Sequence, residues 1–372
     1  MSDLKYWLAL NLLPDIGPFY ARRLLSAFGS PENIFQMPAG ELRKIEGIGE
    51  NRAKSIAGFR QWDVVDKEIS YAKKNNVKIL PFKDPLYPER LRQIPDAPLL
   101  LYVKGDLRDD DKYAMAIVGS RTPTDYGLQV AERISYKLAA YGLTVVSGMA
   151  RGIDGASHKG ALMAGGRTLA VLGSGIDVPY PLENKGLMRA LMPSGALISE
   201  FPLGTKPNTG NFPKRNRIIS GLSLGVLVIE AGVDSGSLIT VGYALEQGRE
   251  VFAVPGNITS KTSKGTNDLI KKGAKLVENA DEIINELAPQ IKGILKETQT
   301  EERQQNISAP APHMTEAEKK VYNILCKGPK HIDAITREVN IPASEALSTL
   351  LSLELKGAVR QMDGKNFLAA NC

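Results

Sequence analysis

The sequence predicts an α/β protein whose core is a doubly wound, mostly parallel sheet, with a smaller helical domain before it and another after it. Between residues 114 and 254, short apolar runs rich in β-branched residues alternate with segments of helix length. The first sixty or so residues carry only short helical patterns, and the last sixty carry three helical patterns and a hairpin. A chain of 372 residues is long enough for two or three such domains.

The first predicted domain, residues 1–65, consists of five short helices. Their segments are "LKYWLALNLL", "PFYARRLLSAF", "SPENIF", "PAGELRKI" and "ENRAKSIAGFR". Two intervening turns, 13–18 and 45–50, each place a glycine before a helix that carries Arg or Lys, which is the spacing of a helix-hairpin-helix. Plain helix-turn packing is the alternative, and the first turn has Asp15 where the pattern would have glycine.

The second predicted domain, residues 66–288, contains the sheet. Its strand patterns are "AMAIV", "LTVVS", "TLAVL", "ALIS", "GVLVIE" and "EVFAV". Each run is short and apolar throughout, as expected for a parallel strand that is covered on both faces. Between the first two runs, Ala131, Ile134, Leu138 and Tyr141 fall on one helical face, which predicts a covering helix.

A polar segment and a compact tail complete the chain. Residues 289–313 are predicted to be a flexible linker, because 296–313 has almost no large apolar residues. In the tail, 314–372, Thr315 and Glu318 have the spacing of a capping box, and two further helical patterns follow. A hairpin pattern with its turn at Asp363-Gly364 closes the chain. Three helices and a hairpin predict a winged helix.

Composition permits an acidic partner and excludes several classes of protein. The net charge of +6 and a pI near 9.0 allow binding to a polyanion. No apolar stretch is long enough for a membrane span and no signal-peptide pattern is present, which predicts a cytoplasmic protein without membrane insertion. Cys326 and Cys372 lie far apart, so we expect no disulfide framework, and the three histidines show no metal-ligand spacing with them.

The loops that follow the strands are the expected ligand site, because ligands of open α/β sheets bind at the carboxyl ends of strands. Glycines there let a backbone approach phosphate, and hydroxyl groups can donate to it. The predicted contacts of this kind are Gly119, Ser120, Gly148, Gly152, Gly173, Ser174, Gly175, Ser235, Gly236 and Ser237. Arg121, Arg151, Arg215 and Arg217 supply positive charge.

No nucleotide cofactor is predicted at these loops. "GSGIDV" has Val178 where a dinucleotide fingerprint has its third glycine, and no phosphate-binding P-loop sequence occurs. Asp154, Ser157 and His158 are close in sequence, but no nucleophile elbow accompanies them. Asp154 is better explained as a helix cap, and His158, one turn further on near the same pocket, is predicted to contact the same ligand.

The stretch "GNFPKRNRIISG", residues 210–221, predicts a site for single-stranded nucleic acid. A base stacked on Phe212 would contribute about 1–3 kcal/mol, while Lys214, Arg215 and Arg217 contact phosphates beside it. Pro213 is expected to keep the segment out of regular helix, and Asn216 to brace the turn. The alternative is a core position for Phe212 with a solvated rim of cations.

Five blocks in order resemble the bacterial DNA-processing protein A (DprA, also called Smf) family. They are "AIVGSRTPTDYG", "VVSGMARGIDGASHKGAL", "VLGSGIDVPYPLENKGL", "ISEFPLGTKPNTGNFPKRNRIISGLS" and "EAGVDSGSLITVGYALEQGREVFAVPGN". The resemblance covers residues 70 to 287, and the head and tail resemble that family's helix-hairpin-helix and winged-helix domains. It implies an extended Rossmann-like fold, a homodimer, and a protein without enzymatic activity.

The resemblance also implies a function. Such a protein binds incoming single-stranded DNA during natural transformation, protects it, and loads the RecA recombinase onto it. The site residues implied by the matching blocks are Arg121, Arg151, Phe212, Arg215, Asn216 and Arg217, with Lys206 and Lys214 added on position and charge.

Two other classes of function remain open from the sequence. One is an enzyme related to nucleoside-monophosphate phosphoribohydrolases, but this chain has Thr240 where their loop has a catalytic glutamate, which leaves only Glu230 nearby. The other is a winged-helix transcription regulator with the core as a sensor. Its third helix carries Glu345 and Glu354 and only Lys356 as a cation, which suits a DNA groove poorly.

Overall fold

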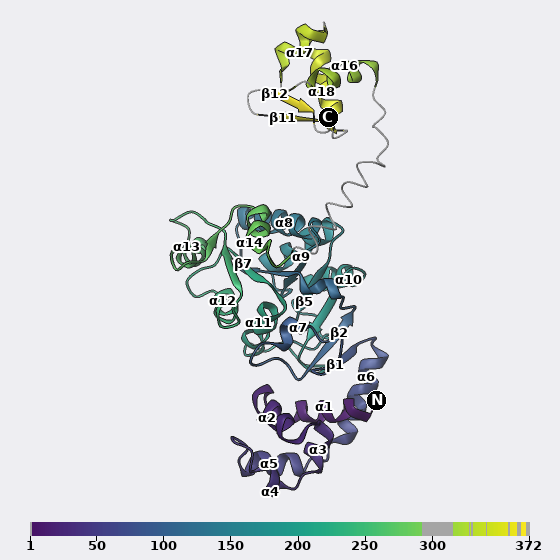
Figure 1. Ribbon diagram of the computed structural model, residues 1–372, viewed down its shortest axis with the longest axis vertical. Helices are drawn as coiled ribbons and strands as arrows, with labels where there is room; N and C mark the ends of the chain where they lie inside the picture. Colours follow the sequence, from purple (N-terminus) through teal and green to yellow (C-terminus); the bar gives the residue numbers. More distant parts are fainter. Residues whose placement is uncertain are drawn as a thin grey trace. The chain divides into compact units, whose positions relative to one another are not determined.

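The computed structural model describes residues 2–291, 315–326, 328, 330–339, 341–355, 358–362 and 366–369 (Figure 1). The chain divides into two compact units, Met1–Thr298 and Gln299–Cys372. The predicted linker lies almost entirely outside the described residues, as does the predicted turn at Asp363-Gly364. The division into four domains therefore stays a prediction.

Short helices fill the N-terminal region, as the sequence predicts. They are α1 (Ser2–Leu12), α2 (Pro18–Phe28), α3 (Pro31–Gln36), α4 (Ala39–Leu42), α5 (Glu50–Ala57) and α6 (Trp62–Lys74). Local signals set their starts: Ser30 caps α3 by accepting a hydrogen bond from the Asn33 amide, and proline occupies the first position of α2 and α3.

The two glycine turns have the same backbone conformation. Asp15 and Gly47 occupy equivalent positions, and both have positive φ, 64° and 84°. Gly17 and Gly49 then cap α2 and α5 with nearly identical dihedral angles. Aspartate tolerates the left-handed region better than most residues, so Asp15 replaces the missing glycine without changing the turn. Arg52 joins the turns, since its guanidinium donates to the Asp15 and Gly47 carbonyls.

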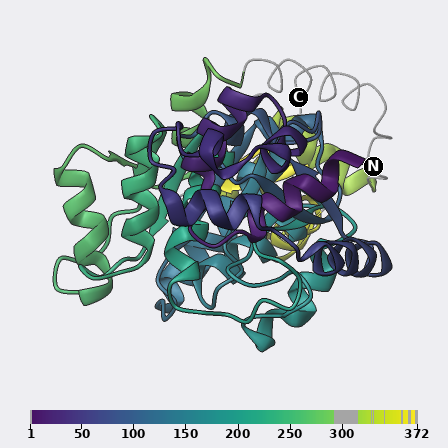
Figure 2. The ribbon, with the colours of Figure 1, turned by 90° about the horizontal axis from the view of Figure 1, so that it is seen from below.

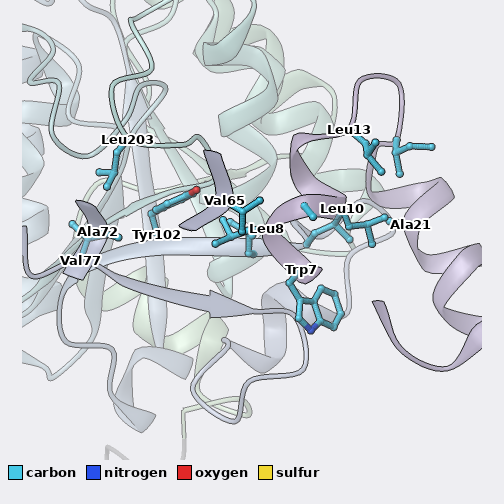
Figure 3. Packing of buried hydrophobic residues seen from close by; sticks show 14 of the residues in the cluster. Trp7, Leu8, Leu10, Leu13, Ala21, Val65, Ala72, Val77, Tyr102 and Leu203 are labelled. Atoms are coloured by element: carbon cyan, nitrogen blue, oxygen red, sulfur yellow. The ribbon is translucent and has the colours of Figure 1, made fainter. Parts of the chain in front are cut away.

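This helical region packs directly on the sheet. One cluster of buried side chains runs from Trp7 and Leu10 in α1, through Val65 in α6, to Tyr102 and Leu203 in the core (Figure 3). Arg22 in α2 adds polar contacts, because it donates to the carbonyls of Ile94 and Pro95. The predicted boundary between residues 65 and 66 falls inside α6.

The sheet has the strand order β1-β2-β6-β5-β4-β3-β7-β8-β9. Its strands are β1 (Lys78–Pro81), β2 (Leu100–Gly105), β3 (Ala114–Gly119), β4 (Thr144–Ser147), β5 (Thr168–Val171), β6 (Ala196–Ser199), β7 (Gly225–Ile229), β8 (Glu250–Ala253) and β9 (Lys275–Leu276). β2 is antiparallel to both its neighbours, and the other pairs are parallel. The order reverses between β3 and β7, which creates a crevice at their carboxyl ends.

All six predicted strand runs are confirmed as β3 to β8, whereas β1, β2 and β9 were not predicted. β1 contains lysine and proline, and β9 has two exposed residues, so neither carries a strand pattern. Alternation along β3 sends Met115 and Ile117 to one buried cluster and Ala116 and Val118 to another.

Helices cover both faces of the sheet (Figures 1 and 2). They are α7 (Glu89–Arg92), α8 (Asp125–Ala140), α9 (Ile153–Met163), α10 (Lys185–Leu191), α11 (Asn211–Leu222), α12 (Ser237–Glu246), α13 (Lys264–Lys271) and α14 (Ala280–Leu287), with short 3-10 turns at Asp109–Lys112, Leu182–Asn184 and Lys261–Ser263. The predicted face of α8 is confirmed, with Ala131, Ile134 and Leu138 buried. Within the described residues, no helix is both long and apolar enough to cross a membrane.

The second unit is a winged helix. Its elements are α16 (Glu316–Leu325), β10 (Lys330–His331), α17 (Ile332–Val339), α18 (Ala343–Leu355), β11 (Val359–Met362) and β12 (Asn366–Ala369). The predicted capping box of Thr315 and Glu318 is present. Leu350 is buried, whereas Leu347 points to solvent. Cys326 is disulfide-bonded, a bridge that the sequence did not predict.

Candidate nucleic-acid interface

Two adjoining cavities lie over the carboxyl ends of the central strands, at the reversal between β3 and β7. The smaller is lined by Arg121, Thr122, Gly148, Ala150, Arg151, Gly173, Ser174, Tyr180, Pro181, Phe212 and Arg215. The larger, about 840 Å³, shares several of these residues and adds Gly119, Ser120, Asp154, Asn216, the 232–237 loop, Thr240, Lys261 and Lys264. That volume is in the range of small-ligand sites.

The segment expected to be irregular around Pro213 is instead the first turn of α11, so that expectation is wrong. Proline is tolerated there because the first amides of a helix have no intrahelical partner. The helix explains which side chains reach the cavities: Phe212, Arg215, Asn216 and Ile219 follow the i, i+3, i+4, i+7 pattern of one face. Asn216 donates to the Gly236 carbonyl, which links α11 to the loop before α12.

Phe212 is half-buried and lies at the wall shared by the two cavities. Its ring centroid is 5.2 Å from the Arg121 guanidinium carbon and 5.5 Å from the Tyr180 ring, which is tilted by 34°. Gly173 makes room for the ring, since a Cβ there would lie 2.7 Å from Phe212 Cδ1. The ring is therefore neither sealed in the core nor free in solvent.

Arg215 is almost completely buried, with 3% of its surface exposed, yet it lines both cavities. Its Nη1 donates to the Val171 carbonyl, while its Nε has no hydrogen-bond partner. Burial lowers the pKa of Arg215 to about 10, an effect that Asp154 opposes, so the guanidinium remains charged at neutral pH. Gly148 allows this position, because a Cβ there would overlap the guanidinium.

Arg217 does not reach the cavities. Its side chain is 7% exposed, and it forms ion pairs with Glu200 and, at 3.1 Å, with Asp96. Because it follows Arg215 by two positions, it lies on a different face of α11. Lys214 is exposed on this helix and, like the exposed Lys206, is absent from both cavity walls.

Three other predicted contacts also lie outside the cavity walls. His158 is fully buried, its Nδ1 lies 2.6 Å from Thr168 Oγ1, and burial lowers its pKa to about 3. Gly152 has φ of 73° and packs tightly against the Ser120 carbonyl. Gly175 is buried and donates its amide to the Thr205 carbonyl. The remaining predicted residues line one cavity or both.

Among the cavity-wall residues that the sequence did not predict are one aromatic side chain and two lysines. Tyr180 is an aromatic residue within "GIDVPYP", the loop whose predicted contacts are Gly173, Ser174 and Gly175. Lys261 and Lys264 belong to the segment after β8, which carries no strand or glycine pattern that would have marked it.

Two buried carboxylates near the crevice are held by hydrogen bonds. Asp154 accepts from the Gly148 and Ala150 amides, so it braces the loop before α9 rather than capping the helix itself. Burial raises the pKa of Asp154, opposed chiefly by Arg215. Glu230, with φ of 50°, accepts from the amide and hydroxyl of Thr124 and thereby holds the loop that carries Arg121.

Within the described residues, no group of three or more His, Cys, Asp or Glu side chains is placed to hold a metal ion. The polar groups that face the larger cavity are instead arginine, lysine, hydroxyl and amide side chains, with Asp154 and Asp234 as the acidic exceptions. Such a set of groups suits an anionic ligand better than a cation.

Three family descriptions match separate parts of this chain. Residues 78–288 match "DNA recombination-mediator protein A", residues 305–365 match "DprA winged helix domain", and residues 8–57 match "SAM-like Helix-hairpin-helix tandem".

Individual proteins agree with these matches. Protein Smf of Synechocystis sp. is 33% identical over 98% of both chains. The crystal structure of DNA processing protein A from Streptococcus pneumoniae is similar, with a TM-score of 0.65 and 35% identity over 76% of this chain and 97% of that one. The corresponding Helicobacter pylori protein, described for its single-stranded DNA binding mode, has a TM-score of 0.52 and 30% identity, over 57% and 96%.

Proposed function

Because this chain belongs to the DNA-processing protein A family, also called Smf, we propose that its cavities bind single-stranded DNA without sequence preference and without altering it chemically. One observation carries the proposal: Phe212 lies among Arg121, Arg151 and Arg215 at the ligand end of the sheet. An aromatic ring can stack with any base, and guanidinium groups pair with phosphates. The H. pylori relative's described binding of single-stranded DNA supports the proposal.

A titration of labelled oligo-dT at two salt concentrations tests the proposal. Affinity should exceed that for duplex and should fall with salt, with a slope of about 0.7 per neutralised phosphate. Arg121→Ala should weaken binding and flatten the salt dependence. Phe212→Ala should weaken binding by about 1–3 kcal/mol and leave the slope nearly unchanged, because stacking releases no counterions. Equal affinity for duplex, or no binding by the wild type, would refute the proposal.

The absence of catalysis is part of this proposal. The Glu230 carboxylate, the candidate catalytic acid, is engaged by Thr124 and is not among the residues lining the cavities. Thr240, where the phosphoribohydrolases have glutamate, lines the larger cavity with a neutral hydroxyl. Incubation with AMP tests the alternative enzyme, since release of adenine would contradict the proposal.

We further propose that the bound strand is protected and passed to the RecA recombinase, as the family resemblance implies. Protection can be measured as the rate of nuclease digestion of oligo-dT with and without the protein. Loading can be measured as RecA-dependent ATP hydrolysis on single-stranded DNA. Unchanged rates in both assays would refute protection and loading, and would leave the proposed DNA binding untouched.

A homodimer is also proposed, and the surface beside β9 is its best-supported location. β9 is the edge strand of the sheet and exposes Leu276, and α12 exposes Leu245. α13, the helix that precedes β9, lies at the left of the core in Figure 1. Exposed apolar surface of this kind marks association sites. Sedimentation should give a dimer at micromolar concentration and a monomer for Leu245→Glu; a monomeric wild type would refute it.

A further inference from the structure

The loop between β5 and α10 forms a wall of the smaller cavity that places an acidic side chain next to a cavity arginine. Tyr180 and Pro181 line the cavity, and Glu183 follows two residues later. Glu183 Oε1 accepts a hydrogen bond from Nη2 of Arg151, one of the three arginines in that cavity wall. The Glu183 carboxylate is thus paired with Arg151, an arginine that in the proposed function binds a DNA phosphate.

A second contact between the same two segments holds this ion pair in place. The side-chain amide of Asn184, next to Glu183, donates to the carbonyls of Met149 and Ala150, which immediately precede Arg151. Both partners of the pair remain accessible, with 66% of the Arg151 side chain and 59% of the Glu183 side chain exposed. The two side chains are therefore held next to each other by the fold, yet an anion from solvent can reach Arg151 and replace Glu183.

Electrostatics agree with this arrangement. A hydrogen bond from its own backbone amide lowers the pKa of Glu183 most, and the hydrogen bond and charge of Arg151 lower it further. Glu183 is thus ionised at neutral pH. A phosphate that approaches Arg151 must displace this carboxylate and remain beside its negative charge.

Resting on the proposed function, we infer that Glu183 is an internal competitor for DNA phosphate, which occupies Arg151 in the free protein and limits the affinity of the site. A single weak anion gains little by displacing Glu183. A DNA strand makes several contacts at once, so it can exchange with the carboxylate at Arg151 while other contacts hold it. The residue lowers affinity and favours a strand over a mononucleotide.

Glu183→Gln tests the inference, because it removes the charge and retains the size of the side chain. Oligo-dT binding by the full-length protein should become about two- to fivefold tighter at about 50 mM salt and should approach the wild-type value at about 200 mM. Affinity for dTMP should rise by a larger factor than affinity for oligo-dT.

Two control variants locate the effect. Glu89→Gln removes another exposed carboxylate paired with an arginine, Arg92, outside both cavities, and should leave binding unchanged. In the double variant Arg151→Ala/Glu183→Gln, binding should equal that of Arg151→Ala or exceed it only slightly, because the competitor acts through Arg151.

The outcomes separate this inference from the proposed function. If the wild type binds oligo-dT and Glu183→Gln binds equally or more weakly, the competitor is refuted and the DNA site stands. A gain of equal size in Glu89→Gln would also refute it, since net charge alone would then explain the change. If the wild type does not bind oligo-dT, the proposed function is refuted, and the inference about Glu183 is refuted with it.

Discussion

Replacement of Arg217 by alanine should destabilise the fold while leaving the salt dependence of DNA binding intact. Arg217 connects α11 by ion pairs to Glu200, directly after β6, and to Asp96. The segment before Asp96 is itself held by Arg22, which donates to the carbonyls of Ile94 and Pro95. Its side chain is 7% exposed, against 15% for Glu200 and 46% for Asp96. The Arg217–Glu200 pair is therefore buried, and its loss leaves a carboxylate without a partner.

The size of the effect follows from that burial. Breaking a buried pair by removing one partner costs about 3–5 kcal/mol. Because Asp96 is hydrated and Glu200 can take up a proton, we expect the lower end, about 3 kcal/mol. That is a large part of the roughly 5–15 kcal/mol that stabilises a typical protein, and it should lower the melting temperature by about 5–10 °C.

A lower pH should reduce the loss of stability caused by Arg217→Ala. Burial raises the pKa of Glu200, an effect that Arg217 opposes, so without Arg217 the folded-state pKa rises further. A carboxyl group with a raised folded-state pKa stabilises the fold as pH falls through that value toward its unfolded value of 4.5. The difference in stability between wild type and Arg217→Ala should therefore be smaller at pH 5 than at pH 8.

Urea melts at the two pH values and oligo-dT titrations at two salt concentrations measure these effects. Arg151→Ala is the matched control, because that arginine is exposed and lines the cavity: its melt should be unchanged and its salt slope smaller. The reasoning is refuted if Arg217→Ala melts like the wild type and loses as much salt slope as Arg151→Ala.

Three further perturbations test the site and its support. Gly148→Ala should weaken oligo-dT binding about tenfold or more, because its Cβ displaces the Arg215 guanidinium, while Gly186→Ala, which meets no atom within 4 Å, should not change binding. Tyr180→Ala should weaken binding with an unchanged salt slope and Tyr180→Phe should restore it, if its ring joins Phe212 in stacking; equal losses in both variants would contradict this. His158 is neutral in the folded protein, so the free energy of unfolding should fall by up to about 1.4 kcal/mol per pH unit as the pH drops from 6.5 toward 3. In urea melts, His158→Gln should make this pH dependence flatter. Parallel curves for the variant and the wild type would show that His158 is not its cause.

The strands of the core could be predicted because each is a continuous apolar run, and the sheet buries both its faces. β1 could not, because an edge strand with one antiparallel neighbour tolerates lysine and proline and so lacks that pattern. The loops of the site were predictable for the related reason that they follow the central strands, whose carboxyl ends must meet at one edge.

The side-chain directions within the site could not be predicted, because they depend on the helical phase of α11. Pro213 suggested an irregular loop, in which Arg215 and Arg217 would have similar surroundings. In the helix, two residues two positions apart point in different directions, so only Arg215 lines the cavities. Tyr180 was missed because its role depends on Phe212, which lies thirty-two residues away in sequence. Contacts between loops of separate strands leave no local pattern.

Glycines at this site act by providing space for side chains from α11 as well as by exposing backbone. Gly148 leaves room for the Arg215 guanidinium, and Gly173 leaves room for the Phe212 ring, so each of these two glycines receives one side chain of the same helical face. A cation buried in this way keeps few hydrogen bonds, and Arg215 Nε has none. Burying an unpartnered charged group is costly unless a ligand completes its contacts. The fold therefore maintains an arginine whose remaining hydrogen-bonding capacity an anion in the adjoining cavity could satisfy.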